Sequence, residues 1–249
     1  MLAKSVDTLV SKLGNNSIYA CDATASGKYN DILDGQHPDI TLVTCSDSRV
    51  IESALDDQIG KIFSIKNIGN RVEPNLGSIE YGVNHLHTPV LMILGHTGCG
   101  AVHASMKDLT GEHHRIVKSL DFIKPIVGEV QKLIIKSGGI DRYRKDHPEA
   151  SIDHITEEQY LETLVTEANV DRQIENLLND DAIRKLVYSG KLMIVGAIYD
   201  FKDIYSEQKG AVFIININGE TEAGKIKKLD VLSGMAGTVT DRVKRLLVY

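Results

Sequence analysis

The sequence has no long apolar run, no set of paired cysteines and no excess of basic residues. No stretch approaches the ~18 consecutive apolar residues of a membrane-spanning helix, so we expect no membrane span. Its three cysteines are too few for a disulfide framework, which favours a reducing and therefore cytoplasmic setting. Its net charge of −6 offers no basic surface, so we expect no nucleic-acid partner.

The composition that is present is ordinary for a globular protein. Hydrophobic residues make up 42% and charged residues 25% of the chain, and we expect residues 1–249 to form one domain. In residues 1–16, apolar side chains recur at helical spacing between charged ones, which predicts an amphipathic helix rather than a signal peptide. We expect an N-terminal helical arm over 1–35, broken around 14–16 and again at Ser26-Gly27.

Strands and helices that alternate along the chain predict an α/β fold with a mainly parallel β-sheet flanked by helices. Apolar runs indicate strands near 40–45, 61–66, 90–94, 191–197 and 211–217. The last strand follows its neighbour after a short link, so we expect it to be antiparallel. Helical patterns lie over 50–59, 76–86, 100–109, 116–137, 162–178 and 239–248. Residues 137–154 are predicted to be a polar loop within an elaborated region, 110–168, and 220–249 a C-terminal extension.

Two cysteines and a histidine directly follow two of these strands. Cys45 ends the apolar run 40–44, and His96 and Cys99 come just after the run 90–94. If these strands lie side by side in a parallel sheet, the three side chains converge at their carboxyl ends, where open α/β sheets place their active sites. Two thiols and one imidazole with a fourth position left open are typical of a catalytic zinc site, not a structural one.

Each signal has a plainer interpretation when taken alone. A single cysteine at the end of a buried strand is usually a small core residue, and a single His-x-x-Cys is a weak metal motif. Asp47 and Arg49 strengthen the pattern after Cys45, because charged side chains at a strand end need a partner or water. Together, the two motifs favour one bound Zn²⁺ per chain.

Four segments resemble, in order and spacing, motifs of the β-class carbonic anhydrases. They are Cys45-Ser46-Asp47-Ser48-Arg49, Asn67-Ile68-Gly69-Asn70, Ser78-Ile79-Glu80-Tyr81 and Gly95-His96-Thr97-Gly98-Cys99-Gly100. The similarity extends from about Asp31 to Val102 and, more weakly, from Asn169 to Phe213. The resemblance implies zinc held by Cys45, His96 and Cys99, and reversible hydration of CO2 to bicarbonate and a proton by zinc-bound hydroxide.

The resemblance also implies roles for the residues beside the ligands. Asp47 orients the nucleophile, and Arg49 holds Asp47 off the metal by a charge-assisted contact; the alternative is an ordinary surface salt bridge. Because two thiolates cancel the charge of zinc, its bound water should ionise less readily unless main-chain N–H groups withdraw charge from the sulfurs. We expect Ser46 and residues 98–100 to supply such groups.

For the substrate, the resemblance implies a pocket that is mainly apolar. Phe63, Val72 and Tyr81 match the apolar wall of the family, and the alternative for each is plain core packing. Gln36 and the amide of Gly100 would stabilise the charge that develops on the product. None of the nine histidines stands out as a proton shuttle.

The motifs leave two other functions open. The same residues fit a carbonyl sulfide or carbon disulfide hydrolase on this fold, or a non-catalytic protein that binds zinc or bicarbonate. The resemblance further implies a homodimer or larger homo-oligomer, with the N-terminal arm packed on a neighbouring subunit. The alternative is a helix folded back on its own sheet.

Overall fold

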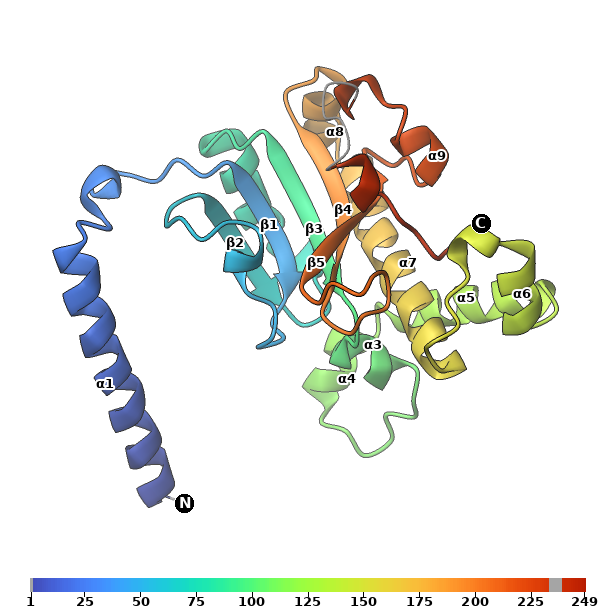
Figure 1. Cartoon of the computed structure of the whole chain (residues 1–249), viewed down its shortest axis with the longest axis horizontal. Helices are drawn as coiled ribbons and strands as arrows, with labels where there is room; N and C mark the ends of the chain where they lie inside the picture. The colour runs from blue at the N-terminus through green and yellow to red at the C-terminus, as the bar shows by residue number, and fades with distance from the viewer. Residues whose placement is uncertain (1, 233–238) are drawn as a thin grey trace.

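The computed structural model describes residues 2–232 and 239–249 and is built around one five-stranded β-sheet (Figure 1). The strands are β1 (Ile40–Cys45), β2 (Ile62–Asn67), β3 (Val90–His96), β4 (Met193–Asp200) and β5 (Ala211–Ile217). Their order across the sheet is β2-β1-β3-β4-β5. The first four run parallel and β5 runs antiparallel to β4, which confirms the predicted sheet and its reversed last strand.

Helices cover the sheet and extend beyond it. They are α1 (Leu2–Ala25), α2 (Leu76–Glu80), α3 (Gly100–Ser105), α4 (His114–Leu120), α5 (Lys124–Lys136), α6 (Ile140–Asp146), α7 (Glu157–Asn179), α8 (Asp181–Tyr188) and α9 (Ala223–Ile226). Strand β1 is buried from its second residue to its last, and β3 is mostly buried. Burial on both faces is the rule for parallel sheets, so apolar runs such as Ile40–Cys45 form strands here without alternating with polar residues.

Helix α7 crosses one face of the sheet and packs on β3 and β4. It begins with a capping box, in which Thr156 and Gln159 each bond the main-chain N–H of the other. The helix approaches β3 closely at Gly95, where an added Cβ would lie 2.8 Å from Val170 Cγ2 and 3.2 Å from Thr166 Cγ2. The lack of a side chain at Gly95 therefore allows α7 to pack closely on β3, the strand that ends in His96.

Replacing Gly95 by alanine is expected to lower the free energy of unfolding by about 1–3 kcal/mol, because the new methyl group overpacks a buried contact. Denaturant unfolding measures this change. Gly128→Ala in the middle of α5 is the matched control, since nothing lies within 4 Å of the added Cβ. That substitution should be neutral or stabilising by about 0.4–1 kcal/mol. Equal effects of the two substitutions would contradict the close packing of α7.

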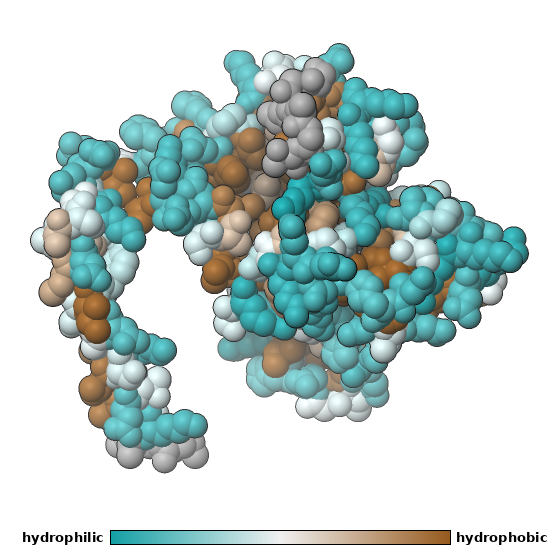
Figure 2. Space-filling model, viewed as in Figure 1, coloured by the Kyte–Doolittle hydropathy of each residue, from teal (hydrophilic) through white to brown (hydrophobic). Residues whose placement is uncertain are grey.

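The N-terminal arm is one continuous helix that extends away from the sheet (Figure 1). The break predicted around 14–16 is wrong, because a single glycine costs a helix only about 1 kcal/mol. The break at Ser26-Gly27 is confirmed: α1 ends at Ala25, and Gly27 has a φ of 64°. Apolar side chains lie exposed along the arm, which is not folded back on its own sheet (Figure 2); they include Val6, Leu9, Val10 and Leu13.

Several predicted boundaries need correction. Residues 50–59 contain one 3₁₀ turn, Glu52–Ala54, in place of a helix, and α3 stops at Ser105. The predicted loop 137–154 contains α6. Within the described ranges, no helix is both long enough and apolar enough to span a membrane.

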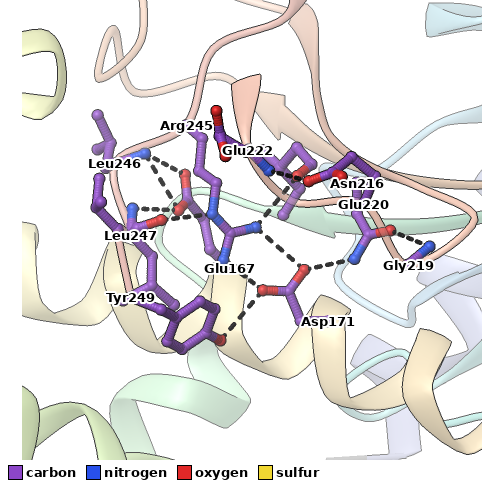
Figure 3. Close-up of polar contacts among 12 residues, drawn as sticks. Glu167, Asp171, Asn216, Gly219, Glu220, Glu222, Arg245, Leu246, Leu247 and Tyr249 are labelled. Carbon is purple, nitrogen blue, oxygen red and sulfur yellow. Dashed lines mark hydrogen bonds and ion pairs between the residues drawn. The ribbon is translucent and has the colours of Figure 1, made fainter. Parts of the chain in front are cut away.

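The C-terminal residues form an extended strap instead of the predicted helix over 239–248. After a 3₁₀ turn at Thr240–Arg242, the chain makes a parallel bridge from Val243 to Ile214 on β5 and runs over α7. Main-chain N–H groups of Leu246 and Leu247 donate to the carboxylate of Glu167 on α7 (Figure 3). These contacts replace the hydrogen bonds of a helix. Residues 1 and 233–238 of the predicted arm and extension lie outside the described residues.

Candidate metal centre

The carboxyl ends of β1 and β3 meet at one edge of the sheet. The two strands pair in parallel, with Thr44 opposite Leu94. Cys45 is the last residue of β1 and His96 the last of β3, while Cys99 directly precedes α3. The predicted side-by-side arrangement is therefore confirmed. It brings three candidate ligands to one edge of the sheet, which we call the metal edge.

The sulfur atoms of Cys45 and Cys99 and a ring nitrogen of His96 all lie within 4.8 Å of one another, and all three residues are buried. This spacing suits one Zn²⁺, whose bonds to sulfur are ~2.3 Å and to nitrogen ~2.0–2.1 Å. Nδ1 of His96 lies 3.1 Å from the carbonyl oxygen of Thr97. Its Nε2 is buried and has no hydrogen-bond partner among the described residues. Buried polar atoms are normally paired, so this nitrogen fits a metal ligand.

The two thiols differ in acidity. A hydrogen bond from Cys99, with smaller contributions from His96 and the main chain of Gly69, lowers the pKa of Cys45 to about 4 despite burial. The same contact, together with burial, raises the pKa of Cys99 well above its usual value. The metal-free pair thus shares one proton, and a bound cation would displace it, because zinc binds cysteine as thiolate.

Main-chain N–H groups of Gly69, Ala101 and Val102 face the sulfurs, and these are not the expected positions, Ser46 and residues 98–100. Gly69, in the loop after β2, supplies one to the β1 cysteine. Ala101 and Val102, in the first turn of α3, supply others to the cysteine that precedes the helix. Ser46 was expected to contribute, but its N–H donates to the carbonyl of Asn67 and so continues the pairing of β1 with β2. Such donors draw charge from thiolate ligands.

Arg49 holds the carboxylate of Asp47 through three donors. Its Nη2 lies 2.7 Å from Oδ2, its Nε 2.9 Å from Oδ1, and its main-chain N 3.0 Å from Oδ1. Nη2 also donates to the carbonyl oxygen of Gly98, which ties the pair to the ligand loop. The guanidinium holds the pKa of Asp47 well below its usual range, so the carboxylate is ionised. Oδ2 is 3.9 Å from His96 Nε2, beside the metal position.

The sequence prediction missed Phe201, which lies against His96. The strand predicted to end at residue 197 continues to Asp200, with Tyr199 paired opposite His96. Phe201 follows and reaches the same edge of the sheet. Its ring stacks on the imidazole of His96, with centroids 5.4 Å apart. Continuing the apolar run to Tyr199 in the sequence would have placed it there.

The predicted substrate residues divide into two groups. Val72 is buried in the same core cluster as Cys45, and Gly100 begins α3 directly after the ligand loop, with open space beside its Cα. Phe63 lies four residues before the end of β2, about 13 Å along the strand from the metal edge. It contacts Tyr81, whose side chain is partly exposed.

Gln36 is also exposed and precedes β1, at the opposite end of this strand from Cys45. Of the five predicted substrate residues, Gly100 directly follows a ligand and Val72 lies in the core beyond the end of β2, whereas Gln36 and Phe63 lie toward the other end of their strands.

Helix α7 anchors the loop that lies over Cys45. Asn169 donates from Nδ2 to the carbonyl oxygen of Gly69 and to Oδ1 of Asn70. Gln173 donates to Asn169 and accepts the main-chain N–H of Val72. These buried amides connect the sheet-covering helix to the metal edge, a link that no local sequence pattern indicates.

The known proteins that this chain resembles are carbonic anhydrases. The profile of a protein family described as Carbonic anhydrase matches residues 40–211. The chain is 27% identical over 189 residues to beta carbonic anhydrase 5, chloroplastic, of Arabidopsis thaliana, covering 72% of this chain and 57% of that protein. It is 31% identical over 174 residues to a carbonic anhydrase of Synechococcus elongatus, covering 67% and 58%. The chain thus spans less than two thirds of the length of these two relatives.

A solved structure is similar over nearly its whole length. It is one of two tetrameric β-carbonic anhydrases from the ascomycete Sordaria macrospora, with a TM-score of 0.66 and 25% identity, covering 84% of this chain and 98% of that one. The similarity reaches beyond the metal edge to most of the fold.

Proposed function

Because this chain belongs to the β-class carbonic anhydrase family, we propose that it catalyses the reversible hydration of CO2 to bicarbonate. The observation that carries the proposal is the buried group Cys45, His96 and Cys99, with Asp47 held beside it by Arg49. Zinc in this site supplies a Lewis acid that lowers the pKa of a coordinated water toward ~7.

The chain's own residues then have separate tasks. The two cysteines and His96 would hold the zinc and leave a fourth ligand position for water, and Asp47 Oδ2 lies 3.9 Å from His96 Nε2. Asp47 is ionised and accepts a hydrogen bond from the attacking water or hydroxide, which orients its lone pair toward CO2. Arg49 occupies both oxygens of Asp47 and so keeps the carboxylate from taking the open position itself. The amide of Gly100 faces the charge that develops on the product.

The remaining wall residues act across an interface in this proposal. Gln36, Phe63 and Tyr81 lie away from the metal edge of their own chain, so they reach a site only in a second copy. A homodimer or larger homo-oligomer would supply that copy, with the exposed apolar face of α1 packed on a neighbour. A cytoplasmic location also belongs to the proposal.

Zinc-loaded protein should hydrate CO2 far faster than buffer alone in a stopped-flow indicator assay. A parallel assay of sulfide release from carbonyl sulfide tests the main alternative substrate. Sulfide release without CO2 hydration would overturn the substrate assignment. Activity in neither assay, with zinc bound stoichiometrically, would leave only the non-catalytic function.

Removing the carboxylate by Asp47→Ala is expected to lower kcat for CO2 hydration about 100-fold, which is the scale for a positioned proton acceptor. Zinc content should stay at one per chain, because the three ligands are untouched. Asp39→Ala is the matched control: this aspartate pairs with Lys61 at the surface and should leave kcat unchanged. A wild-type rate no higher than that of the Asp47 variant would remove Asp47 from the mechanism.

A further inference from the structure

Phe201 lies between the two groups that shape the metal edge. The first is His96, whose ring stacks on that of Phe201 with centroids 5.4 Å apart and 27° between the ring planes. The second is Arg49, whose Cζ lies 4.4 Å from the centre of the Phe201 ring. A cation over an aromatic face is attracted by the electrons of the ring, and stacking restricts rotation of the imidazole. A single side chain therefore contacts a ligand and the residue that restrains Asp47.

The position of Phe201 is itself fixed by a buried network. Its main-chain N–H donates to Oγ1 of Thr97, the residue after His96, at 3.2 Å. The Thr97 hydroxyl in turn donates to Asp200, which is fully buried. Asp200 also accepts the main-chain N–H groups of Lys202, Ile204 and Tyr205, so the turn after β4 is closed around this carboxylate. Hydrogen bonding of its own main chain and of the turn that follows therefore fixes the position of Phe201.

Arg49 needs such a support because half of its side chain is exposed. A solvated guanidinium that is held only by one carboxylate samples other rotamers, at a gain in entropy. If Arg49 moved, Asp47 would be released beside the open ligand position. The ring of Phe201 and the carbonyl of Gly98 restrain the guanidinium in addition to Asp47.

We propose that Phe201 is a positioning residue, which holds Arg49 in the orientation that keeps Asp47 away from the metal. This inference rests on the proposed function for its catalytic meaning. It concerns access to the open ligand position, and that access is measurable without turnover. Phe201 does not touch the reacting atoms in this proposal.

The test measures azide binding to the cobalt-loaded protein through its visible absorption. Phe201→Ala is expected to weaken azide binding about tenfold, within the range of couplings between contacting residues, because Asp47 competes for the open position. Phe201→Tyr keeps the ring and should bind azide within about twofold of wild type. Phe201→Leu keeps the apolar volume without the ring, and it takes the place of the alanine variant if that variant does not fold.

The decisive measurement repeats Phe201→Ala in the Asp47→Ala background. If Phe201 acts by restraining Asp47, its loss has no further effect on azide binding once the carboxylate is gone. An equal loss in both backgrounds would assign Phe201 a merely structural role and overturn the proposal, as would unchanged azide binding in the single variant. Because azide binding does not depend on CO2 hydration, failure of this inference and failure of the proposed function are distinguishable.

Discussion

Replacing His96 by alanine is expected to abolish stoichiometric zinc binding and CO2 hydration together. The variant leaves only two ligands, both sulfurs, and opens a cavity where the buried imidazole lay. Even groups that merely support a ligand change metal affinity by about 10–100-fold, so loss of a ligand should exceed that range. Elemental analysis of the purified variant gives the zinc content, and stopped-flow kinetics gives the rate.

His103→Ala is the matched control for this prediction. His103 lies one helical turn beyond Cys99, but its side chain is partly exposed and contacts Glu162 of α7 at 3.3 Å. Its loss should leave zinc content at one per chain. If the His96 variant retained full zinc and turnover, the three-ligand site would be wrong.

The second large effect is expected at the C-terminal strap, where Arg245→Met should lower the free energy of unfolding by about 3–5 kcal/mol. The guanidinium of Arg245 is almost fully buried and donates to both oxygens of Asp171 and to the carbonyl oxygens of Ile215 and Leu247 (Figure 3). Its removal leaves the carboxylate of Asp171 without its cation, with only Asn216 and Tyr249 still donating to it, and takes positive charge away from Glu167. Methionine fills most of the volume, so the cost is mainly electrostatic.

The loss should depend on pH in a defined direction. Burial raises the pKa of Glu167, and the nearby charge of Arg245 opposes that rise. Without Arg245 the folded-state pKa of Glu167 rises further above its unfolded-state pKa. At a pH between these two pKa values, the unfolded chain binds fewer protons than the folded one. The deficit of the variant therefore grows once the pH rises above the raised folded-state pKa that Glu167 has in the wild-type protein, and it is smaller at lower pH.

Chemical denaturation of the metal-free protein at pH 4 and pH 7 measures both effects. Arg242→Met, three residues earlier, is the control, because Arg242 donates to the Gln208 side chain and lies over Phe213. It should cost less than about 1 kcal/mol, with little change between the two pH values. A deficit at Arg245 no larger than at Arg242 would show that the strap contributes little to stability.

Local sequence patterns were enough to predict the metal edge because its parts are encoded locally. Cys45 and His96 each end an apolar run, and parallel pairing brings the ends of such runs together. Helix α8 was missed, although Asp180 accepts the N–H groups of Ala182 and Ile183 and marks its start.

The strap could not be predicted from such patterns. Residues 239–248 are apolar and basic at spacings that fit a helix, and their extended form depends on Glu167 and Asp171, more than seventy positions away. The anchoring of Gly69 by Asn169 depends on a contact over 100 positions. Contacts of this kind are set by tertiary packing and produce no periodic pattern in the sequence.

The strap has a consequence for how the protein is made. Glu167 precedes its main-chain donors, Leu246 and Leu247, by about eighty positions, so a ribosome adds α7 well before it adds them. During synthesis this carboxylate must stay hydrated, so α7 cannot settle fully on the sheet until those residues emerge. Closure over such a long separation is slow and leaves apolar surface exposed meanwhile. The nascent chain is therefore most prone to aggregate after α7 has emerged and before Leu246 and Leu247 have.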